Sequence, residues 1–324
     1  MTHAATIELV APTLADIRAA SARIRPYANR TPVLTCASLN ERTGARLFLK
    51  CENMQKVGAF KFRGACNAVF SMSDDEARRG VVCHSSGNHA QALALAARLR
   101  GIPAYIVMPT SAPAVKKAAV EGYGGLITLC EPTLAARETT TAQVIERTGA
   151  TEVHPYHNPR IIAGQGTATL ELLEDVPDLD VVMAPVGGGG LLSGTAIAAT
   201  ELKPGVRVIA AEPANADDAA RSIAAGRIIP SNNPRTIADG LLTSLGELNF
   251  RIIRERVERI ITVSEEAIIE AMRLVFERAK LVIEPSAAVT FGALLDKPSD
   301  LQGKKIGIIV CGGNVDLSRL PWQV

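Results

Sequence analysis

The chain has 324 residues, of which 47% are hydrophobic and 21% are charged. This length allows one large or two medium domains with a substantial core, and the apolar fraction excludes a mostly disordered chain. The 35 Lys and Arg residues nearly balance the 33 Asp and Glu residues, and the resulting net charge of +2 gives no reason to expect nucleic acid or an anionic membrane as a partner.

The first predicted element is a helix, because Thr13 and Asp16 form a capping box ahead of apolar residues at helical spacing. A short strand is expected at 46–50, and an apolar helix face follows Lys61. From residue 80 onward, short apolar runs alternate with helical segments across turns that contain Gly or Pro. The expected strands are 80–83, 104–108 and 126–130, and the expected helices are 88–100, 114–121 and 134–147.

The same alternation returns after a predicted helix at 161–174. The expected strands are 180–184, 206–211 and 305–311, and the first and last of these are followed by glycines. Strands without a polar face that alternate with helices indicate parallel sheets covered on both sides. We therefore expect an α/β fold of two closely packed parallel-sheet domains, with ligand sites at the C-terminal ends of the strands.

The six cysteines form no CxxC pair, and no cluster of His and Cys has the spacing of a zinc site. Scattered thiols of this kind fit a reducing cytosol better than a disulfide framework. No apolar run approaches the roughly 20 residues that span a bilayer, and no basic segment precedes an apolar run near residue 1. We therefore expect a cytoplasmic protein without a membrane partner.

Four consecutive glycines, here called the glycine cup, stand between the strand at 180–184 and the next helix. They are Gly187, Gly188, Gly189 and Gly190. Backbone N–H groups without neighbouring Cβ atoms can point inward, and the helix N-terminus adds the positive end of its dipole, so the cup suits a phosphate. The spacing fits neither the GxGxxG dinucleotide motif nor a P-loop. A tight strand-to-helix turn is the alternative interpretation.

Two further segments carry reactive or polar groups. Lys61 lies between Phe60 and Phe62, where partial desolvation would lower the pKa of the amine and make it a nucleophile. An ordinary lysine that packs its stem beside aromatic rings is the alternative. The run His-Ser-Ser-Gly-Asn-His-Ala-Gln at 84–91 opens a helix, and so many polar groups at a helix N-terminus suit a carboxylate. Helix capping would explain only one or two of them.

Taken together, seven motifs in chain order resemble one family, the fold-type-II pyridoxal-phosphate (PLP) enzymes. They are AFKFRG around Lys61, SSGNHAQ at 85–91, AGQGT at 163–167, PVGGGG at 185–190, TIADG at 236–240, IEPSAA at 283–288 and CGGNVD at 311–316. More narrowly, the chain resembles the branch of serine racemases and of serine, threonine and 3-hydroxyaspartate dehydratases. The resemblance implies a tryptophan synthase β-like fold with a large PLP-binding domain (1–72 and 158–324) and a small α/β domain (73–157).

The resemblance also implies how PLP would be held. Lys61 would bind PLP as a Schiff base and then act as the base at the substrate Cα. The glycine cup would hold the phosphate, Asn88 would bond the 3′-oxygen, and Cys311 would face the pyridine nitrogen. A neutral thiol does not keep that nitrogen protonated, which favours β-elimination over transamination. The implied cofactor-binding residues are Phe60, Lys61, Asn88, Gly187, Gly188, Gly189, Gly190, Leu191 and Cys311.

For the substrate, the resemblance implies a carboxylate-binding loop and one arginine. The implied substrate residues are Ser85, Asn88, His89, Gln91 and Arg137. Ser86 matches the serine that acts as acid and base in serine racemases, on the face opposite Lys61, whereas many threonine dehydratases have alanine there. Capping of the helix by Ser86 is the alternative interpretation.

A metal site is implied at the acidic turn of residues 212–218. Glu212, Asp218 and the carbonyl of Ala216 would supply oxygen ligands to Mg²⁺, Ca²⁺ or Mn²⁺. From spacing alone, a solvated acidic turn is the alternative, and only the EPxNADD stretch of serine racemases favours the metal. The match weakens at the nucleotide site of animal serine racemases, at 36–38 and Val57, which argues against activation by ATP.

We therefore expect a PLP-dependent ammonia-lyase that removes water and then ammonia from 3-hydroxyaspartate, L-serine or L-threonine to give a 2-keto acid. A serine racemase with dehydratase side activity is the alternative. A second carboxylate, as in 3-hydroxyaspartate, would need cations such as Arg137 or the cluster of His154, His157 and Arg160. Surface positions are the alternative for the last two.

Two other classes fit less well. A β-replacement transferase would show an SGNTG-like loop, which the chain lacks. A non-catalytic binding protein would keep the glycine cup and have no need of Lys61. We expect a small-molecule amino-acid substrate, no nucleic-acid partner and, from the family, a homodimer.

Overall fold

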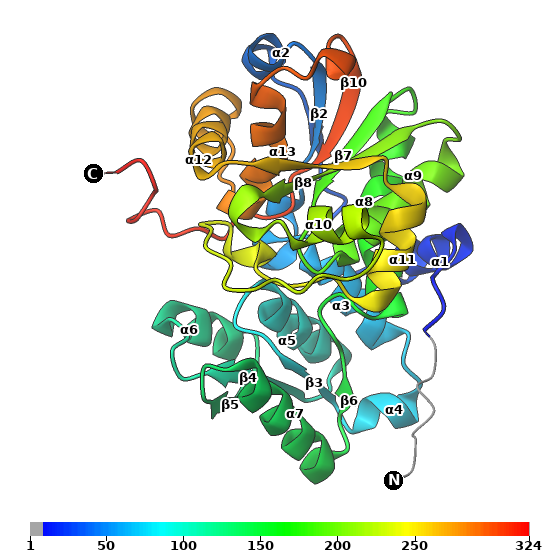
Figure 1. Ribbon diagram of the computed structural model, residues 1–324. Helices are drawn as coiled ribbons and strands as arrows, with labels where there is room; N and C mark the ends of the chain where they lie inside the picture. Colours follow the sequence, from blue (N-terminus) through cyan, green and yellow to red (C-terminus); the bar gives the residue numbers. More distant parts are fainter. Residues whose placement is uncertain (1–8, 324) are drawn as a thin grey trace.

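The computed structural model describes residues 9–323, which form two sheets covered by helices (Figure 1). The larger sheet has the strand order β1-β2-β10-β7-β8-β9, and the smaller has the order β5-β4-β3-β6. The larger sheet contains β1 (Val33–Leu34), β2 (Arg46–Lys50), β7 (Val181–Pro185), β8 (Arg207–Pro213), β9 (Arg259–Val263) and β10 (Lys305–Ile309). The smaller sheet contains β3 (Val81–His84), β4 (Ala104–Pro109), β5 (Gly125–Cys130) and β6 (Thr151–Glu152).

Helices cover both faces of each sheet. In the larger part, α9 contacts β7 and β8 from one side, and α13 contacts the same strands and β9. In the smaller part, α5 and α7 both contact β3, β4 and β5. The helices are α1 (Leu14–Ile24), α2 (Ala37–Thr43), α3 (Lys61–Phe70), α4 (Asp74–Arg78), α5 (Asn88–Arg100), α6 (Ala114–Gly122), α7 (Leu134–Thr148), α8 (Pro159–Asp175), α9 (Gly190–Leu202), α10 (Asp218–Ala225), α11 (Glu247–Arg256), α12 (Glu265–Leu274) and α13 (Pro285–Leu295).

The strand pairs are parallel except at one edge. The two residues of β1 pair antiparallel with β2, whereas β2, β10, β7, β8 and β9 run parallel to their neighbours, as do the strands of the smaller sheet. The prediction of two mainly parallel sheets is therefore confirmed, and β1 is an antiparallel addition that it did not include. The predicted capping box is present, since Thr13 and Asp16 bond each other's backbone N–H at the start of α1.

Glycines bring three helices into backbone contact beneath the larger sheet. A Cβ on Gly164 in α8 would lie 2.6 Å from the Cα of Gly64 in α3, and one on Gly166 would lie 2.9 Å from the carbonyl oxygen of Gly194 in α9. A larger side chain at these positions would push the helices apart. The close approach of α3, α8 and α9 brings the N-termini of α3 and α9 toward the same edge of the sheet.

The division at residues 72 and 157 stays a prediction. The strands of the smaller sheet lie between residues 81 and 152, and those of the larger sheet come from both sides of this segment. Figure 1 draws the smaller sheet with α5, α6 and α7 below the larger sheet and its helices. No helix within residues 9–323 is long and apolar enough to cross a membrane.

Candidate active site

The C-terminal ends of β7 and β10 meet at one edge of the larger sheet, because the two strands are parallel neighbours. The glycine cup follows β7 and Cys311 follows β10. The segment before α3 joins this edge: the N–H of Phe60 donates to the carbonyl of Cys311 at 2.9 Å, and that of Gly313 donates to Gly58 at 2.9 Å. Lys61, the first residue of α3, is thereby held beside Cys311.

The amine of Lys61 is directed to the segment that connects the two sheets. Its Nζ donates to the carbonyl of Pro155 at 3.0 Å and lies 5.1 Å from the centre of the Phe60 ring. Burial lowers the pKa of this amine to about 8, although the nearby groups of Cys311 and Glu284 favour its charged form. About a tenth of Lys61 is therefore uncharged at pH 7, far more than of an ordinary lysine, and the uncharged amine is the form that a nucleophile or base requires.

The positions of the glycine cup have no room for a side chain. A Cβ on Gly188 would lie 2.4 Å from the ring of Tyr156, and one on Gly187 would lie 2.9 Å from the Cα of Leu241. Gly189 has φ = 89°, a left-handed conformation that suits glycine. Because Tyr156 follows Pro155 in the chain, the carbonyl that accepts from Lys61 lies next to the residue that packs on the cup.

The amides of the glycine cup are buried and free to bind an anion. Within residues 9–323, the N–H groups of Gly187, Gly188 and Gly189 have no hydrogen-bond acceptor, and the first backbone bond of α9 runs from Ser193 to Gly189 at 2.8 Å. Unpaired buried amides are costly unless a partner is supplied. Together with the start of α9, they provide the donors that a phosphate group requires.

The loop between β3 and α5 also leaves a helix N-terminus open. The N-cap residue is Gly87, which makes no side-chain capping bond, so Ser86 does not cap the helix. Ser85, Ser86 and Asn88 are half-buried, whereas His89 and Gln91 are buried. The loop therefore offers amides and hydroxyls at the C-terminal end of a parallel strand, where ligands of such sheets bind.

His89 is a buried neutral histidine. Its Nε2 lies 2.8 Å from the carbonyl of Val153 and donates to it, which leaves Nδ1 unprotonated, buried and without a partner in the described part of the chain. Burial and the nearby Lys61 lower the pKa of His89 to about 3. Its ring therefore supports the loop without adding charge to the site.

Two residues without a predicted role connect the loops of the site. The Nδ2 of Asn88 donates to both carboxylate oxygens of Glu284 at 3.1 Å, and the Nδ2 of Asn314 donates to the Oδ1 of Asn88 at 2.8 Å. Burial raises the pKa of Glu284 to about 7. Glu284 and Asn314 lie in the IEPSAA and CGGNVD motifs quoted above, and their place in these motifs was the only indication in the sequence that they belong to the site.

Cys311 is buried at the same edge as a neutral thiol. Burial and the carboxyl group of Glu284 raise the pKa of Cys311 well above its ordinary value. A ring nitrogen that faced this thiol would find a weak donor rather than a carboxylate.

Arg137 is the candidate substrate residue that has a buried hydrogen-bond donor without a partner in the described part of the chain. It lies in the first turn of α7, half-buried, and its Nε is buried without a hydrogen-bond partner among residues 9–323. Its charge contributes to the lowered pKa of His84, after burial and against the opposing charge of Glu152, so the guanidinium lies near the C-terminal end of β3. An anion at this position would bind the guanidinium and relieve the unpaired donor.

Two of the other predicted cations have partners of their own. Arg160 forms an ion pair with Glu76 at 2.9 Å, and the Nε2 of His157 accepts from the N–H of Leu248 at 3.4 Å. The proposed basic cluster of His154, His157 and Arg160 is therefore wrong for Arg160, whose charge a carboxylate already neutralises. The interpretation of Arg160 as a partly exposed structural residue holds instead.

The acidic turn lies at the end of β8 and start of α10. The carboxylate of Glu212 accepts from the N–H groups of Ala219 and Ala220, at 2.9 Å each. Both carboxylate oxygens of Asp218 are buried without a hydrogen-bond partner among the described residues, although Ser231 lies nearby. No group of three or more His, Cys, Asp or Glu side chains in residues 9–323 could hold a metal ion. The predicted ligand set has only two such side chains and one carbonyl.

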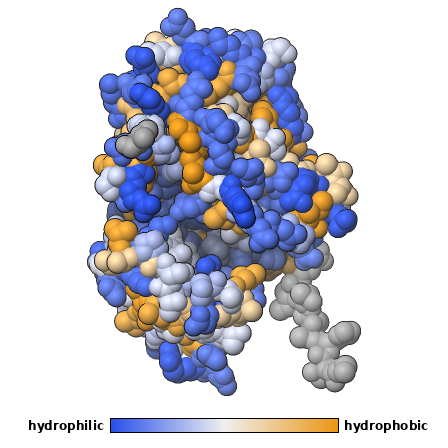
Figure 2. Space-filling model, turned by 60° about the vertical axis from the view of Figure 1, so that its left-hand side comes forward, coloured by the Kyte–Doolittle hydropathy of each residue, from blue (hydrophilic) through white to orange (hydrophobic). Residues whose placement is uncertain are grey.

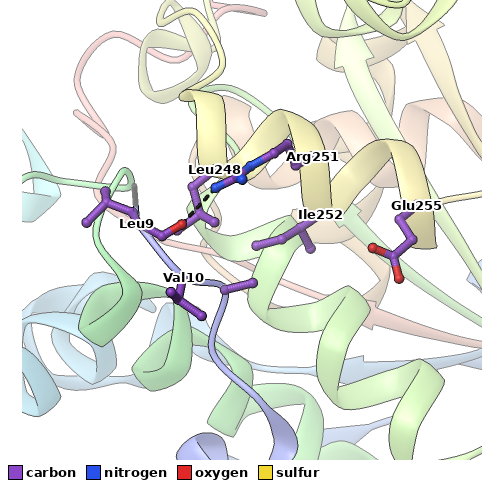
Figure 3. Close-up of a pocket in the computed structure, with 7 residues that line it drawn as sticks. Leu9, Val10, Leu248, Arg251, Ile252 and Glu255 are labelled. Carbon is purple, nitrogen blue, oxygen red and sulfur yellow. Dashed lines mark hydrogen bonds between the residues drawn. The ribbon is translucent and has the colours of Figure 1, made fainter. Parts of the chain in front are cut away.

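The surface is hollowed between the larger and smaller parts of the molecule, with hydrophilic side chains around the hollow (Figure 2). A second hollow, with a volume of about 420 Å³, lies where residues 9–11 pass α11 (Figure 3). It is lined by Leu9, Val10, Ala11, Leu248, Arg251, Ile252 and Glu255. None of the candidate site residues lines this second hollow.

The sequence profile of the family described as "Pyridoxal-phosphate dependent enzyme" matches residues 24–312. The chain belongs to this PLP-dependent family. The buried free amides of the glycine cup and the desolvated amine of Lys61 are what the phosphate and the aldehyde of PLP would require, so the residues present fit the cofactor.

Two PLP-family relatives are similar over nearly their whole length. The beta-hydroxyaspartate dehydratase of Paracoccus denitrificans (strain Pd 1222) is 53% identical over 312 residues, which cover 96% of this chain and 99% of that protein. The L-threo-3-hydroxyaspartate ammonia-lyase of Saccharomyces cerevisiae (strain ATCC 204508 / S288c) is 49% identical over 312 residues, 96% of each chain. Among solved structures, the serine racemase of Dictyostelium discoideum superposes with a TM-score of 0.91 at 52% identity, covering 94% of this chain and 99% of that one. The two sheets are thus those of fold-type-II PLP enzymes.

Proposed function

We propose that the protein is a PLP-dependent dehydratase that converts 3-hydroxyaspartate to oxaloacetate and ammonia. The observation that carries the proposal is the buried, unpartnered Nε of Arg137 near the C-terminal end of β3. A substrate with a second carboxylate would satisfy this donor, whereas serine and threonine would leave it unpaired. Two relatives that act, by their names, on hydroxyaspartate support the same substrate.

When bound, PLP would supply an electron sink that makes the Cα proton of the amino acid acidic. In the proposed mechanism, the amine of Lys61 accepts this proton, for which its lowered pKa of about 8 is suited. Hydroxide leaves from Cβ with a proton as water, and hydrolysis then releases ammonia and the 2-keto acid.

The remaining residues position the reactants. The amides of the glycine cup and Leu191 would hold the phosphate, and Phe60 would pack beside the ring. The thiol of Cys311 would face the pyridine nitrogen without protonating it, because its raised pKa keeps it neutral and a poor acid. Asn88, whose amide is fixed by Glu284, would bond the 3′-oxygen.

The open N-terminus of α5 would bind the α-carboxylate of the substrate. Ser85, Asn88, His89 and Gln91 belong to this loop in the proposal. Because Gly87 provides no side-chain cap, the first amides of α5 are available to the carboxylate, and the helix dipole favours its negative charge.

Replacement of Arg137 by methionine tests the substrate. We expect kcat/KM for 3-hydroxyaspartate to fall about 10- to 100-fold, because a hydrogen bond to a charged group contributes roughly 1.5–3 kcal/mol. Activity on serine and threonine should change little. Steady-state release of keto acid from the three substrates measures both effects, and Arg160→Met, which removes an arginine paired with Glu76, is the matched control. An equal loss on serine would contradict the assignment of Arg137 to the second carboxylate.

A second candidate function is serine racemisation, which the similarity to serine racemases and the position of Ser86 favour. Ser86 is half-buried and does not cap α5, so its hydroxyl is free to carry a proton on the face opposite Lys61. Ser86→Ala should remove the formation of D-serine from L-serine while pyruvate release is largely kept. Chiral analysis of serine together with a pyruvate assay decides the point, and a parallel loss of both products would refute the two-face arrangement.

We also propose that the acidic turn binds Mg²⁺, Ca²⁺ or Mn²⁺ through Glu212, Asp218 and the carbonyl of Ala216. The buried, unpartnered oxygens of Asp218 support this site, since two carboxylates without a cation repel each other and lose their hydration. Each cation should raise the melting temperature by several degrees, because a ligand that binds only the folded state stabilises it. Asp218→Asn should remove this shift, and Asp217→Asn, whose carboxylate pairs with Arg221, should keep it. A shift that survives in Asp218→Asn would rule out the site.

Compartment, assembly and domains are finer proposals. All six cysteines are free thiols, and four of the six are fully buried to within 2%, which supports a reducing cytoplasm. We propose a homodimer from the family resemblance, and a division into a large domain (1–72 and 158–324) and a small one (73–157). Light scattering and limited proteolysis would test the dimer and the division.

A further inference from the structure

Val57, four residues before Lys61, has an uncommon backbone conformation. Its φ of 56° and ψ of 15° are left-handed, which is a genuine outlier for a β-branched side chain. Gly58, which follows it, is also left-handed, with φ = 69°. Two consecutive left-handed residues turn the chain directly into the segment that carries Phe60 and Lys61. Such a conformation persists only where its surroundings hold it.

Asn314 makes the contacts that hold this turn. Its Nδ2 donates to the carbonyl of Val57 at 2.7 Å, and a Cβ on Gly58 would lie 2.6 Å from its Oδ1. No other side chain in the described part of the chain hydrogen-bonds the backbone of Val57. The side chain of Val57 is 7% exposed, so the turn cannot relax without moving groups that pack around it.

The same side chain reaches the second loop of the site. The Nδ2 of Asn314 also donates to the Oδ1 of Asn88 at 2.8 Å, and its backbone N–H donates to Glu284 at 3.2 Å. Because the Oδ1 of Asn88 accepts from Asn314, its Nδ2 is turned toward the Glu284 carboxylate. Asn314, which lies in the segment after β10, therefore connects the Lys61 segment, the N-terminus of α5 and the start of α13.

We propose that Asn314 is a positioning residue, which keeps Val57 in its left-handed conformation and thereby places the Lys61 amine at the cofactor. This inference rests on the proposed role of Lys61 in binding PLP. Asn314 does not touch the reacting atoms and acts through the backbone of Val57 and the amide of Asn88. Asn314 is exposed, so its replacement leaves no cavity in the core.

The double substitution of Asn314 and Val57 tests the coupling. Asn314→Ala should raise the dissociation constant of PLP about 10-fold, which corresponds to about 1.4 kcal/mol. Glycine adopts positive φ without strain, so Val57→Gly should make the turn independent of Asn314. In the Val57→Gly background, Asn314→Ala should therefore raise the dissociation constant by no more than about 3-fold. Equilibrium dialysis against PLP, with absorbance of the bound cofactor, measures all four proteins.

Two further variants separate positioning from folding. Asn314→Asp keeps the size of the side chain but loses the donor, so it should weaken PLP binding to the same extent as alanine. Asn53→Ala removes a similar bond, from the Nδ2 of Asn53 to the carbonyl of Val282 at 3.0 Å, without touching Val57, and should leave PLP affinity unchanged. The proposal would be overturned if Asn314→Ala raised the dissociation constant of PLP by the same factor with valine and with glycine at position 57. Unchanged PLP affinity in Asn314→Ala would also overturn it. PLP affinity is measured without substrate, so failure of the proposed dehydratase activity leaves this test intact.

Discussion

Lys61→Ala is expected to lower kcat on 3-hydroxyaspartate and serine by on the order of 10⁴-fold, the upper range for loss of a general base. The reason is the environment of the amine: burial lowers its pKa to about 8, and a hydrogen bond to the carbonyl of Pro155 fixes its position. Steady-state assays of keto-acid release, with PLP in excess, measure the loss.

Lys56 provides the matched control for this prediction. It lies in the same loop, and its amine is 5.7 Å from the centre of the Phe62 ring and near Cys66. Lys56→Ala should keep most of the activity. A small primary amine such as methylamine should restore part of the activity of Lys61→Ala, because it replaces the amine that the variant lacks. Turnover within about 10-fold of the natural protein would contradict the role of Lys61.

The fold followed from the sequence because buried parallel strands leave a strong local pattern. Apolar runs bounded by glycine and proline predicted β3, β4, β5, β7, β8 and β10 to within a few residues. The strands that were missed, β1, β6 and β9, all lie at the edges of the two sheets. β1 and β6 have only two residues each, and β9 has a half-exposed pattern, so none of them shows the continuous apolar run of a central strand.

The site followed less completely, because much of it depends on contacts between distant segments. The glycines and Lys61 have local signatures, whereas the bond between Asn88 and Glu284 joins residues 196 positions apart. Arg160 illustrates the opposite error. Its charge suggested a substrate ligand, but Glu76, 84 positions away, had already neutralised it. Side-chain chemistry shows what a residue can bind, and only the fold shows which partner it has.

The second large effect concerns a buried network of charges behind the site. Arg63, in the first turn of α3, donates to Glu52 at 2.7 Å and to Glu171 at 2.7 Å. Lys50 donates to Glu171 at 2.6 Å and to the carbonyl of Thr31 at 2.7 Å. The side chains of Lys50, Arg63 and Glu52 are fully buried. Although burial alone would raise the pKa of Glu171, its bonds to Arg63 and Lys50 lower it, so this carboxylate is held charged beside the two cations.

Arg63→Met should reduce the free energy of unfolding by about 3–5 kcal/mol, since it removes the cation paired with the buried Glu52 and leaves Glu171 with Lys50 alone. Arg30 provides the control because it also pairs with two carboxylates, Glu174 and Asp175, but is half exposed to solvent. Arg30→Met should cost no more than about 1 kcal/mol. Urea denaturation followed by circular dichroism compares the two variants.

Equal losses in Arg63→Met and Arg30→Met would show that burial does not decide the strength of this network. The expected difference has a consequence for the site. Arg63 lies two residues after Lys61, and the network fixes the start of α3 against β2 and α8. Weakening it should therefore release the Lys61 segment before the rest of the sheet unfolds. Bound PLP should be lost at a lower urea concentration than the far-ultraviolet signal, and only in Arg63→Met.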